Sequence, residues 1–388
     1  MTDKTTYPGD NMTYLDNAAT TRVSENAAQA VMDAMRENYG NPSSLHRMGL
    51  DAELIVTDAR KTIAKAISAA PETITFTSGA TEANNTLLRG AAKVYGRRKN
   101  TIVATSIEHP SVEETLKALE QEGFIVKRVK PRADGSISLT DYLYAVDNDT
   151  FLATCMYVNN ETGAINDVAD IFSSVKLKAP DCITHTDAVQ AFMKIPMKVT
   201  ELDADLITFS GHKIHAPKGV GAMYIRKGLR IPPIMTGGGQ EKGLRSGTEA
   251  VPLIAGLGAA VKEQLPQIDV ARSNAVMLGE RLRSQLSELP YVKVNSGANC
   301  SPYIVNISVE GIRSEIMLHF LESRHVYVSS GSACSKGKHS RVLSEMGMSD
   351  KQADTALRIS FSKMSSWGEI EQFVSALKEG YMSLEKIK

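Results

Sequence analysis

The stretch Ile207-Thr-Phe-Ser-Gly-His-Lys-Ile-His-Ala-Pro-Lys-Gly219 indicates both the fold and a functional site. An apolar, strand-like run ends there in polar side chains, among them Lys213. A carboxylate, Asp187, stands near the end of the preceding strand-like run, in His185-Thr-Asp-Ala-Val-Gln190. Pyridoxal phosphate (PLP) requires a lysine that forms a Schiff base and an aspartate that keeps the pyridine nitrogen protonated. The two side chains therefore predict a PLP site.

Strand-like runs of the same kind recur between residues 72 and 226, and amphipathic helical runs lie between several of them. This alternation predicts an α/β fold, in which helices cover both faces of a mostly parallel sheet. We expect strands at 74–77, 101–105, 124–129, 151–158, 182–186, 206–209 and 221–225, with helices that include 82–94 and 112–121. Ligands of such sheets bind at the carboxyl ends of the strands. The polar side chains that directly follow strand-like runs are Thr81, His109, Asn160, Asp187 and Lys213.

The pattern changes after about Pro252. A long helical run at 268–289 is followed by a strand-like run at 303–309, a helical run at 314–323, a strand-like run at 356–361 and a final helical run at 370–384. This order predicts a smaller α+β domain. We expect residues 1–14 to be an N-terminal extension that is flexible or part of the small domain. Residues 15–255 would form the large PLP-binding domain, and residues 256–388 the small domain.

Composition excludes several classes of protein. The 388 residues are 42% hydrophobic, and 44 basic side chains balance 44 acidic ones. A nucleic-acid or membrane-surface binder would carry a basic excess, and no run approaches the roughly 18 apolar residues of a membrane span. The four cysteines form no CxxC pair, which argues against a zinc site or a disulfide framework. With a polar N-terminus that lacks a signal-peptide pattern, we expect a cytoplasmic protein without direct contacts to membrane or nucleic acid.

Two glycine-containing segments are candidates for binding the PLP phosphate. Thr77-Ser-Gly-Ala-Thr-Glu82 follows a strand and opens a helix, where backbone N–H groups attract an anion; an ordinary helix cap is an equally good explanation. The segment 237–248 contains Arg245, Ser246 and Thr248 among its glycines. It is either a flexible linker or an anion contact, and loops of this kind often reach a neighbouring subunit.

Three further side chains have both a functional and an ordinary explanation. His109 could lie over a flat cofactor ring or simply start a helix, and Arg358 could clamp a carboxylate or extend from a strand to solvent. Cys334 lies in Ser329-Ser-Gly-Ser-Ala-Cys334, with Lys336, Lys338 and His339 close behind. Cations and a helix start lower the pKa of a thiol, so we favour a reactive thiolate over an inert one. The histidines match no standard metal spacing, and we expect no metal site in the isolated chain.

In its motifs the chain resembles the cysteine desulfurases of the NifS/IscS type, which belong to the class V aminotransferase group of PLP enzymes. The similarity runs from Tyr14-Leu-Asp-Asn-Ala-Ala-Thr-Thr21 to Arg358. It includes Val158-Asn-Asn-Glu-Thr-Gly163, Arg245-Ser-Gly-Thr248 and the segments around Thr81, Lys213 and Cys334. The Ser-Gly-Ser-Ala-Cys context is similar to that of group I of these enzymes.

The resemblance implies PLP-dependent transferase fold type I and a role for each site residue. Lys213 would bind PLP and act as the base, Asp187 would pair with the pyridine nitrogen, and His109 would stack on the ring and assist proton transfer. The remaining implied contacts are Gln190 with the ring hydroxyl, Ala80, Thr81, Ser210 and His212 with the phosphate, Thr248 with the phosphate bound by the other subunit of a homodimer, and Asn160 and Arg358 with the substrate carboxylate.

The implied reaction converts L-cysteine to L-alanine and leaves a persulfide on Cys334, the nucleophile. The sulfur would then pass to an acceptor protein for iron–sulfur cluster assembly or tRNA thiolation. Cys334 could also serve as a transient iron–sulfur ligand with a scaffold partner. The alternatives are a selenocysteine lyase and a class V aminotransferase for another amino acid. A protein of this fold that only binds partners and has no activity would not require Lys213, Asp187, His109 and Cys334 together.

Overall fold

The computed structural model describes residues 12–330 and 340–386. Its largest sheet has seven strands in the order β2-β8-β7-β6-β5-β3-β4. Their bounds are Ile74–Thr77 for β2, Thr101–Thr105 for β3, Ile125–Val129 for β4, Thr150–Thr154 for β5, Ile183–Asp187 for β6, Leu206–Ser210 for β7 and Gly221–Ile225 for β8. The central strands β5, β6 and β7 are buried along their whole length. The sequences of β5 and β7 are rich in apolar side chains because both faces of the sheet are covered, whereas β6 is mostly polar although it is equally buried.

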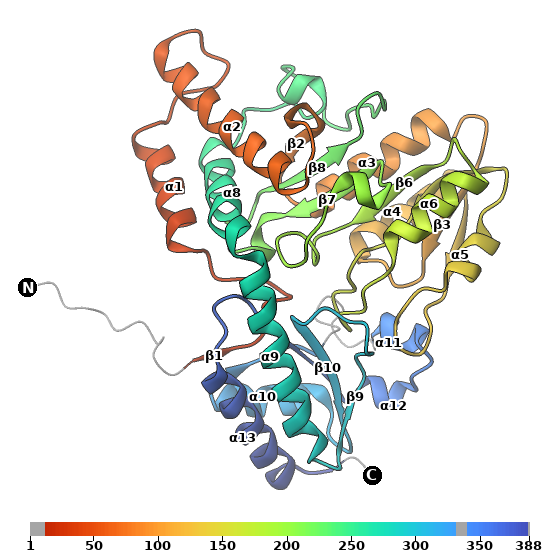
Figure 1. Cartoon of the computed structure of the whole chain (residues 1–388), viewed down its shortest axis with the longest axis vertical. Helices are drawn as coiled ribbons and strands as arrows, with labels where there is room; N and C mark the ends of the chain where they lie inside the picture. The colour runs from red at the N-terminus through yellow and green to blue at the C-terminus, as the bar shows by residue number, and fades with distance from the viewer. Residues whose placement is uncertain (1–11, 331–339, 387–388) are drawn as a thin grey trace, which may run out of the picture.

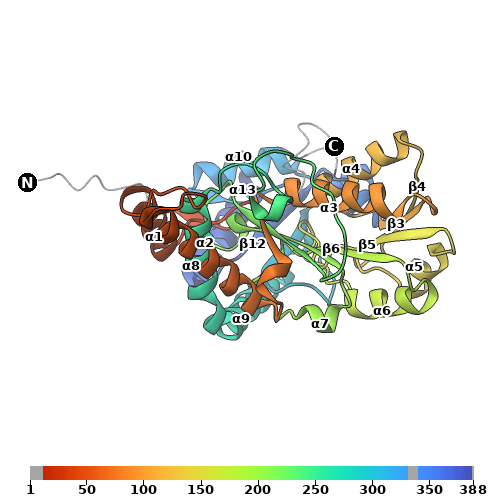
Figure 2. The ribbon, with the colours of Figure 1, turned by 90° about the horizontal axis from the view of Figure 1, so that it is seen from above.

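Helices lie on both faces of this sheet, as Figure 2 shows. One face carries α3 (Ala80–Tyr95) and α4 (Pro110–Gln121); the other carries α5 (Leu139–Ala145), α6 (Val168–Lys178) and α7 (Val199–Leu202). The predicted mostly parallel sheet with helical layers is confirmed. All strands run parallel except β8, which is antiparallel to both of its neighbours, β2 and β7.

The predicted strand at 151–158 ends earlier than expected, at Thr154. Beyond that point Cys155 and Tyr157 still donate backbone hydrogen bonds to the carbonyls of His185 and Asp187, at 3.1 Å each. These bonds continue alongside β6 while the chain bends into the loop that carries Asn160. The early end of the strand therefore turns this loop toward the carboxyl edge of the sheet.

A column of helices joins the two parts of the molecule (Figure 1). Helix α8 (Val251–Gln264) packs against α1 (Glu25–Arg36) and α2 (Arg47–Ala66). A single 3₁₀ turn, Leu265–Gln267, connects α8 to the long helix α9 (Ile268–Ser287). Figure 1 shows α9 running down beside the C-terminal strands.

The C-terminal part has its own small antiparallel sheet, in the order β12-β10-β9. Its elements are β9 (Val292–Val294), β10 (Ile304–Val309), α10 (Ser314–Ser323), β11 (Val326–Tyr327), α11 (Arg341–Glu345), α12 (Asp350–Ala353), β12 (Ala356–Ser360) and α13 (Trp367–Ser383). The N-terminal strand β1 (Thr13–Tyr14) pairs with β11, and Leu15 and Ala18 pack in the C-terminal core. The residues after Tyr14 thus contribute to this core, and the domain limits at 14 and 255 stay a prediction. None of the helices formed by residues 12–330 and 340–386 is long and apolar enough to cross a membrane.

Candidate active site

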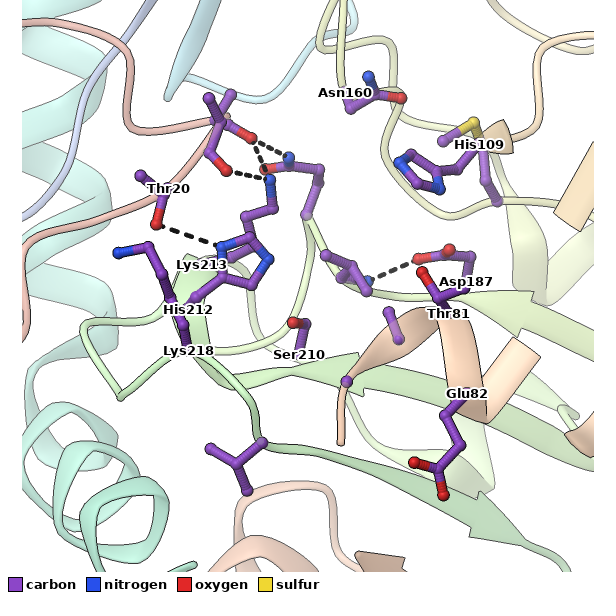
Figure 3. Close-up of a pocket in the computed structure, with 18 of the residues that line it drawn as sticks. Thr20, Thr81, Glu82, His109, Asn160, Asp187, Ser210, His212, Lys213 and Lys218 are labelled. Carbon is purple, nitrogen blue, oxygen red and sulfur yellow. Dashed lines mark hydrogen bonds between the residues drawn. The ribbon is translucent and has the colours of Figure 1, made fainter. Parts of the chain in front are cut away.

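A cavity of about 590 Å³ lies at the carboxyl ends of the parallel strands (Figure 3). It brings together the predicted site residues Ala80, Thr81, His109, Asn160, Asp187, Gln190, Ser210, His212, Lys213 and Arg358. Two further predicted residues stand apart from this set. Thr248 is exposed elsewhere on the chain, and Cys334 lies outside the described residues.

Lys213 and Asp187 enter this cavity from opposite sides (Figure 3). Lys213 ends a single 3₁₀ turn, Gly211–Lys213, that directly follows β7. Its Nζ donates to the carbonyl oxygens of Ala18 and Ala19, at 2.6 Å each. Asp187 is the last residue of β6, and its Oδ1 accepts the backbone N–H of Val189 at 3.0 Å. An amine and a carboxylate therefore face a common space large enough for an aromatic ring between them.

The start of α3 offers unoccupied backbone donors to an anion. Gly79 is the N-cap of α3 and provides no side-chain cap, so the first N–H groups of the helix are left for another acceptor. Gly79 has a φ of +154°, which side-chain-bearing residues rarely adopt. A Cβ on Gly221 would come within 2.8 Å of the Gly79 Cα. Both glycines are thus required for this turn to lie against β8.

His212 and Ser210 approach the same end of the cavity from β7 and the turn that follows it. Burial, with the nearby cation of Lys213, lowers the pKa of His212 to about 4. The imidazole is therefore neutral at physiological pH, and its Nδ1 lies 3.2 Å from the hydroxyl of Thr20. A neutral imidazole and a hydroxyl can both donate hydrogen bonds to a phosphate.

Arg358, on β12, holds a carboxylate of the chain itself. Its Nη2 donates to Asp16 Oδ1 at 2.8 Å, and its Nη1 donates to the carbonyl oxygen of Asn160 at 2.9 Å. Burial raises the pKa of Asp16, while Arg358 opposes this shift. The Nε of Arg358 is buried and has no hydrogen-bond partner among residues 12–330 and 340–386. A buried donor without a partner indicates that a further acceptor belongs there.

Gln190 is held in place by a buried lysine that the sequence analysis did not identify. Lys194 donates to Gln190 Oε1 at 2.8 Å, and Gln190 Nε2 donates to the carbonyl of Ala18 at 2.9 Å. Burial, with Lys213 and Arg358 nearby, lowers the pKa of Lys194 to about 7. Because a carbonyl oxygen can only accept, Ala18 fixes Gln190 with its amide nitrogen away from Lys194. The spacing of Gln190 and Lys194 by four residues is the only signal that could have indicated this pair.

Glu108, directly before His109, is a fully buried acid. Its Oε1 accepts hydrogen bonds from Thr105 Oγ1 and from the Met156 backbone N–H, both at 2.8 Å. Burial is the main cause that raises its pKa from 4.5 to about 8. The carboxyl group is therefore protonated in the folded protein at neutral pH. Through these two hydrogen bonds Glu108 holds the loop before α4, and this loop carries His109.

We expect Glu108 to make the protein less stable as the pH rises from about 5 to about 8. Over this range the folded chain retains a proton that the unfolded chain releases, so the free energy of unfolding falls. Glu108→Gln removes this dependence. In thermal unfolding, the Tm of this variant relative to wild type should therefore increase by a few degrees between pH 5 and pH 8. A difference in Tm that stays constant or decreases over this range would contradict a neutral Glu108.

The second glycine-containing segment is anchored at Glu241 and exposed at its end. Glu241 forms a buried ion pair with Arg60 at 2.7 Å and also accepts the backbone N–H of Phe76 at 3.1 Å. Arg245 pairs with Glu82 at 3.0 Å, so its guanidinium is engaged within the chain. Thr248, three residues later, is exposed. Its predicted phosphate contact in another subunit stays a prediction.

The remaining cysteines and potential metal ligands do not form a second centre in the described structure. Cys155 and Cys182 are completely buried, as small core residues are, and Cys300 is half-buried beside Arg283. Within residues 12–330 and 340–386, no group of three or more His, Cys, Asp or Glu side chains could hold a metal ion.

The chain is similar to known proteins along almost its whole length. The family described as Aminotransferase class-V matches residues 13–373. A protein of Nostoc sp. named "Cysteine desulfurase" is 37% identical over 370 residues, which cover 94% of this chain and 92% of that protein. "Cysteine desulfurase IscS" of Pectobacterium atrosepticum is 36% identical over 374 residues, with 94% and 92% covered. A solved structure named "NIFS-LIKE PROTEIN" superposes with a TM-score of 0.92 at 38% identity, covering 96% of this chain and 100% of that one.

Proposed function

The chain belongs to the class-V aminotransferase family, and from this membership we propose that it is a PLP-dependent cysteine desulfurase of the NifS/IscS type. The predicted family and fold type are confirmed. Its relatives named above are cysteine desulfurases and a NifS-like protein, which does not favour a selenocysteine lyase or an aminotransferase for another amino acid. The observation that carries the proposal is the Lys213–Asp187 pair across the cavity.

The residues that line the cavity fit PLP. When bound, PLP supplies an electron-withdrawing ring that stabilises negative charge on the substrate α-carbon. Lys213 and Asp187 would hold its two ends, since the amine suits the aldehyde and the carboxylate suits the pyridine nitrogen. Gly79 supports this fit, because the uncapped start of α3 provides the donors that a phosphate needs. The other residues that would hold the cofactor are His109, Gln190, Ala80, Thr81, Ser210 and His212.

Lys213 and Arg358 would perform the first steps on the substrate. Lys213 is already within the cavity, where its Nζ can take the proton from the α-carbon and return a proton to the product. The partnerless Nε of Arg358 is a donor suited to the substrate carboxylate. Asn160, next to it in the cavity, would complete this carboxylate site.

Substitutions at the two ends of the Asp16–Arg358 pair should change substrate binding in opposite directions. Asp16 competes for the guanidinium, so Asp16→Asn is expected to lower the KM for L-cysteine by about threefold to tenfold. Arg358→Lys loses the forked donor geometry and should raise KM by about tenfold or more. Steady-state kinetics of alanine formation measures both. If Asp16→Asn also raised KM, Asp16 would be a support of the clamp rather than a competitor.

Cys334 would be the sulfur acceptor. Its thiolate would attack the sulfur of the substrate; the C–S bond breaks, an S–S bond forms, and the released carbon takes a proton to give alanine. The flanks of the segment 331–339 support this role. Ser329 exchanges two backbone hydrogen bonds with Arg358, at 2.6 and 3.2 Å, and Arg341 donates to the carbonyl of Glu108 at 2.5 Å. One flank of this segment is therefore hydrogen-bonded to the site residue Arg358, and the other to Glu108, which precedes His109.

We also propose a homodimer in which Thr248 reaches the phosphate of the other subunit. Large apolar side chains that are exposed in the single chain cluster in α1, α2 and the connection between them: Met32, Met35, Tyr39, Leu45, Met48, Leu50 and Leu54. An exposed apolar surface of this kind suits a protein interface. A cytoplasmic location and an iron–sulfur scaffold or tRNA-thiolation protein as sulfur acceptor complete the proposal.

The test is alanine formation from L-cysteine by the PLP-loaded protein, with and without a thiol reductant. L-cysteine is itself a thiol that can reduce a persulfide, so the expected signal is a burst. Without added reductant about one alanine per active site should form quickly, because Cys334 retains the sulfur, and an added strong thiol reductant should then increase the rate of turnover. Bound PLP without alanine would show a PLP enzyme for a different amino acid. Alanine formation without a burst, at a rate that added reductant does not change, would argue against a persulfide on the protein.

A further inference from the structure

A buried asparagine on α3 connects the two side chains proposed to flank the cofactor ring. Asn84 has no exposed surface, although it is polar. Its Nδ2 donates to Asp187 Oδ2 at 2.9 Å and to Ser111 Oγ at 2.8 Å. The Ser111 hydroxyl in turn lies 2.8 Å from His109 Nδ1. A continuous chain of hydrogen bonds therefore links Asp187, through Asn84 and Ser111, to His109.

The direction of these hydrogen bonds determines where the imidazole carries its proton. The backbone N–H of Ser111 can only donate, and it points to His109 Nδ1 at 3.1 Å. Nδ1 is therefore the acceptor nitrogen. Burial lowers the pKa of His109, which favours the neutral imidazole. In a neutral ring with an acceptor at Nδ1, the hydrogen is on Nε2.

The hydroxyl of Ser111 extends this reasoning to Asn84. A hydroxyl has one hydrogen. Because Nδ1 of His109 is an acceptor, Ser111 Oγ donates that hydrogen to it and must itself accept from Asn84. Both hydrogens of the Asn84 amide are thus used, one toward each side of the proposed ring site.

The remaining oxygen of Asn84 shows why the amide faces this way. Oδ1 is buried and has no hydrogen-bond partner in the described part of the chain, a state that costs free energy. Turning the amide would direct Oδ1 at the carboxylate of Asp187 and remove the donor from it. The charge of Asp187 therefore determines the orientation of Asn84, and Asn84 determines that of Ser111 and His109.

We propose that Asn84 and Ser111 are positioning residues that hold His109 as its Nε2–H tautomer and keep Asp187 aligned for the cofactor. This inference rests on the proposed function. His109 lines the cavity, and Nε2 is its remaining nitrogen. In the resting enzyme His109 then presents a hydrogen-bond donor that stabilises negative charge on the substrate. The task of removing a proton belongs to Lys213.

The test uses PLP-loaded protein labelled with ¹⁵N-histidine, in which NMR distinguishes the two tautomers. Loss of one signal set in His109→Gln assigns the resonances. We expect wild-type His109 to be in the Nε2–H form. Asn84→Leu keeps the approximate size of the side chain and removes its donors without adding a second carboxyl group beside Asp187, and Ser111→Ala is a milder change should that variant fold poorly. In both variants the backbone N–H of residue 111 still donates to Nδ1, so the Nε2–H form persists. With the hydrogen bonds from Asn84 or the Ser111 hydroxyl removed, we expect the ¹⁵N signal of Nδ1 to shift toward that of a less hydrogen-bonded acceptor nitrogen, with a loss of kcat of about tenfold to a hundredfold and little change in KM.

Asn85→Leu is the matched control, since Asn85 is the next asparagine on α3 and contacts only Thr81 and Arg89 of its own helix in the described hydrogen-bond network. It should change neither the ¹⁵N signal of Nδ1 nor kcat. The proposal is overturned if wild-type His109 is in the Nδ1–H form or is protonated. It is also overturned if Asn84→Leu and Ser111→Ala leave the ¹⁵N signal of Nδ1 unchanged, even with reduced kcat. The NMR measurement requires no turnover, so it tests the positioning of His109 independently of the proposed desulfurase activity.

Discussion

Lys213→Ala is expected to abolish alanine formation and the visible absorption of the bound cofactor. Nζ of Lys213 is fixed in the cavity by the carbonyls of Ala18 and Ala19 and lies across from Asp187. Removing this amine removes both the covalent attachment of PLP and the proposed base. General base catalysis alone contributes about a hundredfold to ten-thousandfold, and we expect a loss at the upper end or beyond. Absorption spectra and an alanine assay measure the two effects.

Lys218→Ala is the control for Lys213→Ala, because Lys218 lines the same cavity and is exposed. This variant should keep the visible absorption band. If Lys218→Ala lost the band and Lys213→Ala retained it, the assignment of Lys213 as the lysine that binds PLP would be wrong. Retention of alanine formation in Lys213→Ala would contradict the proposed base, whatever the spectrum.

The sequence allowed most of the sheet to be predicted strand by strand because most of its strands are buried, the edge strand β4 excepted. Such strands are short runs rich in apolar and β-branched residues, and β2, β3 and β8 have the predicted bounds. The direction of β8 could also have been inferred. Residues 211–220 connect it to β7, and a parallel crossover needs a dozen or more residues. This connection is too short, so β8 must be antiparallel.

Strand ends also explain why many of the candidate site residues could be predicted. Asp187 and Lys213 come at or just after the ends of neighbouring strands, and parallel strands place those ends at one edge. The partners of these residues were not predictable in the same way. Asn84 reaches Asp187 from a helix, and Asp16 reaches Arg358 from a distant part of the chain. Such pairs arise from tertiary packing, which leaves no local pattern in the sequence.

The position of Asn84 in the sequence nevertheless gives a weak indication of its buried role. It lies on the side of α3 that also contains Leu87, Leu88 and Ala91, all completely buried. A polar side chain on the apolar face of an amphipathic helix must find a partner in the interior. Its neighbour Asn85 shows the contrast, because it bonds to its own helix near the surface. Position on the helix face, rather than residue type, thus separates the two asparagines.

Cys334→Ala is expected to retain bound PLP and its visible absorption while alanine formation falls to background. The reason is chemical: Lys213, Asp187 and the start of α3 would bind the cofactor without a thiol, whereas removal of sulfur from L-cysteine needs a nucleophile that accepts it. Without the Cys334 thiolate the C–S bond has no acceptor for its sulfur, and the substrate should stay bound or be released unchanged. Alanine release and mass spectrometry of the protein persulfide measure the outcome.

Cys300→Ala is the matched control for Cys334→Ala. Cys300 is a half-buried thiol beside Arg283, in a cavity separate from that of Lys213. Its replacement should leave alanine formation and the persulfide signal unchanged. If Cys334→Ala still produced alanine and sulfide at the original rate, sulfur would leave the substrate without a protein acceptor. Cys334 would then not be the nucleophile, and a lyase mechanism based on Lys213 and Asp187 would explain the site better.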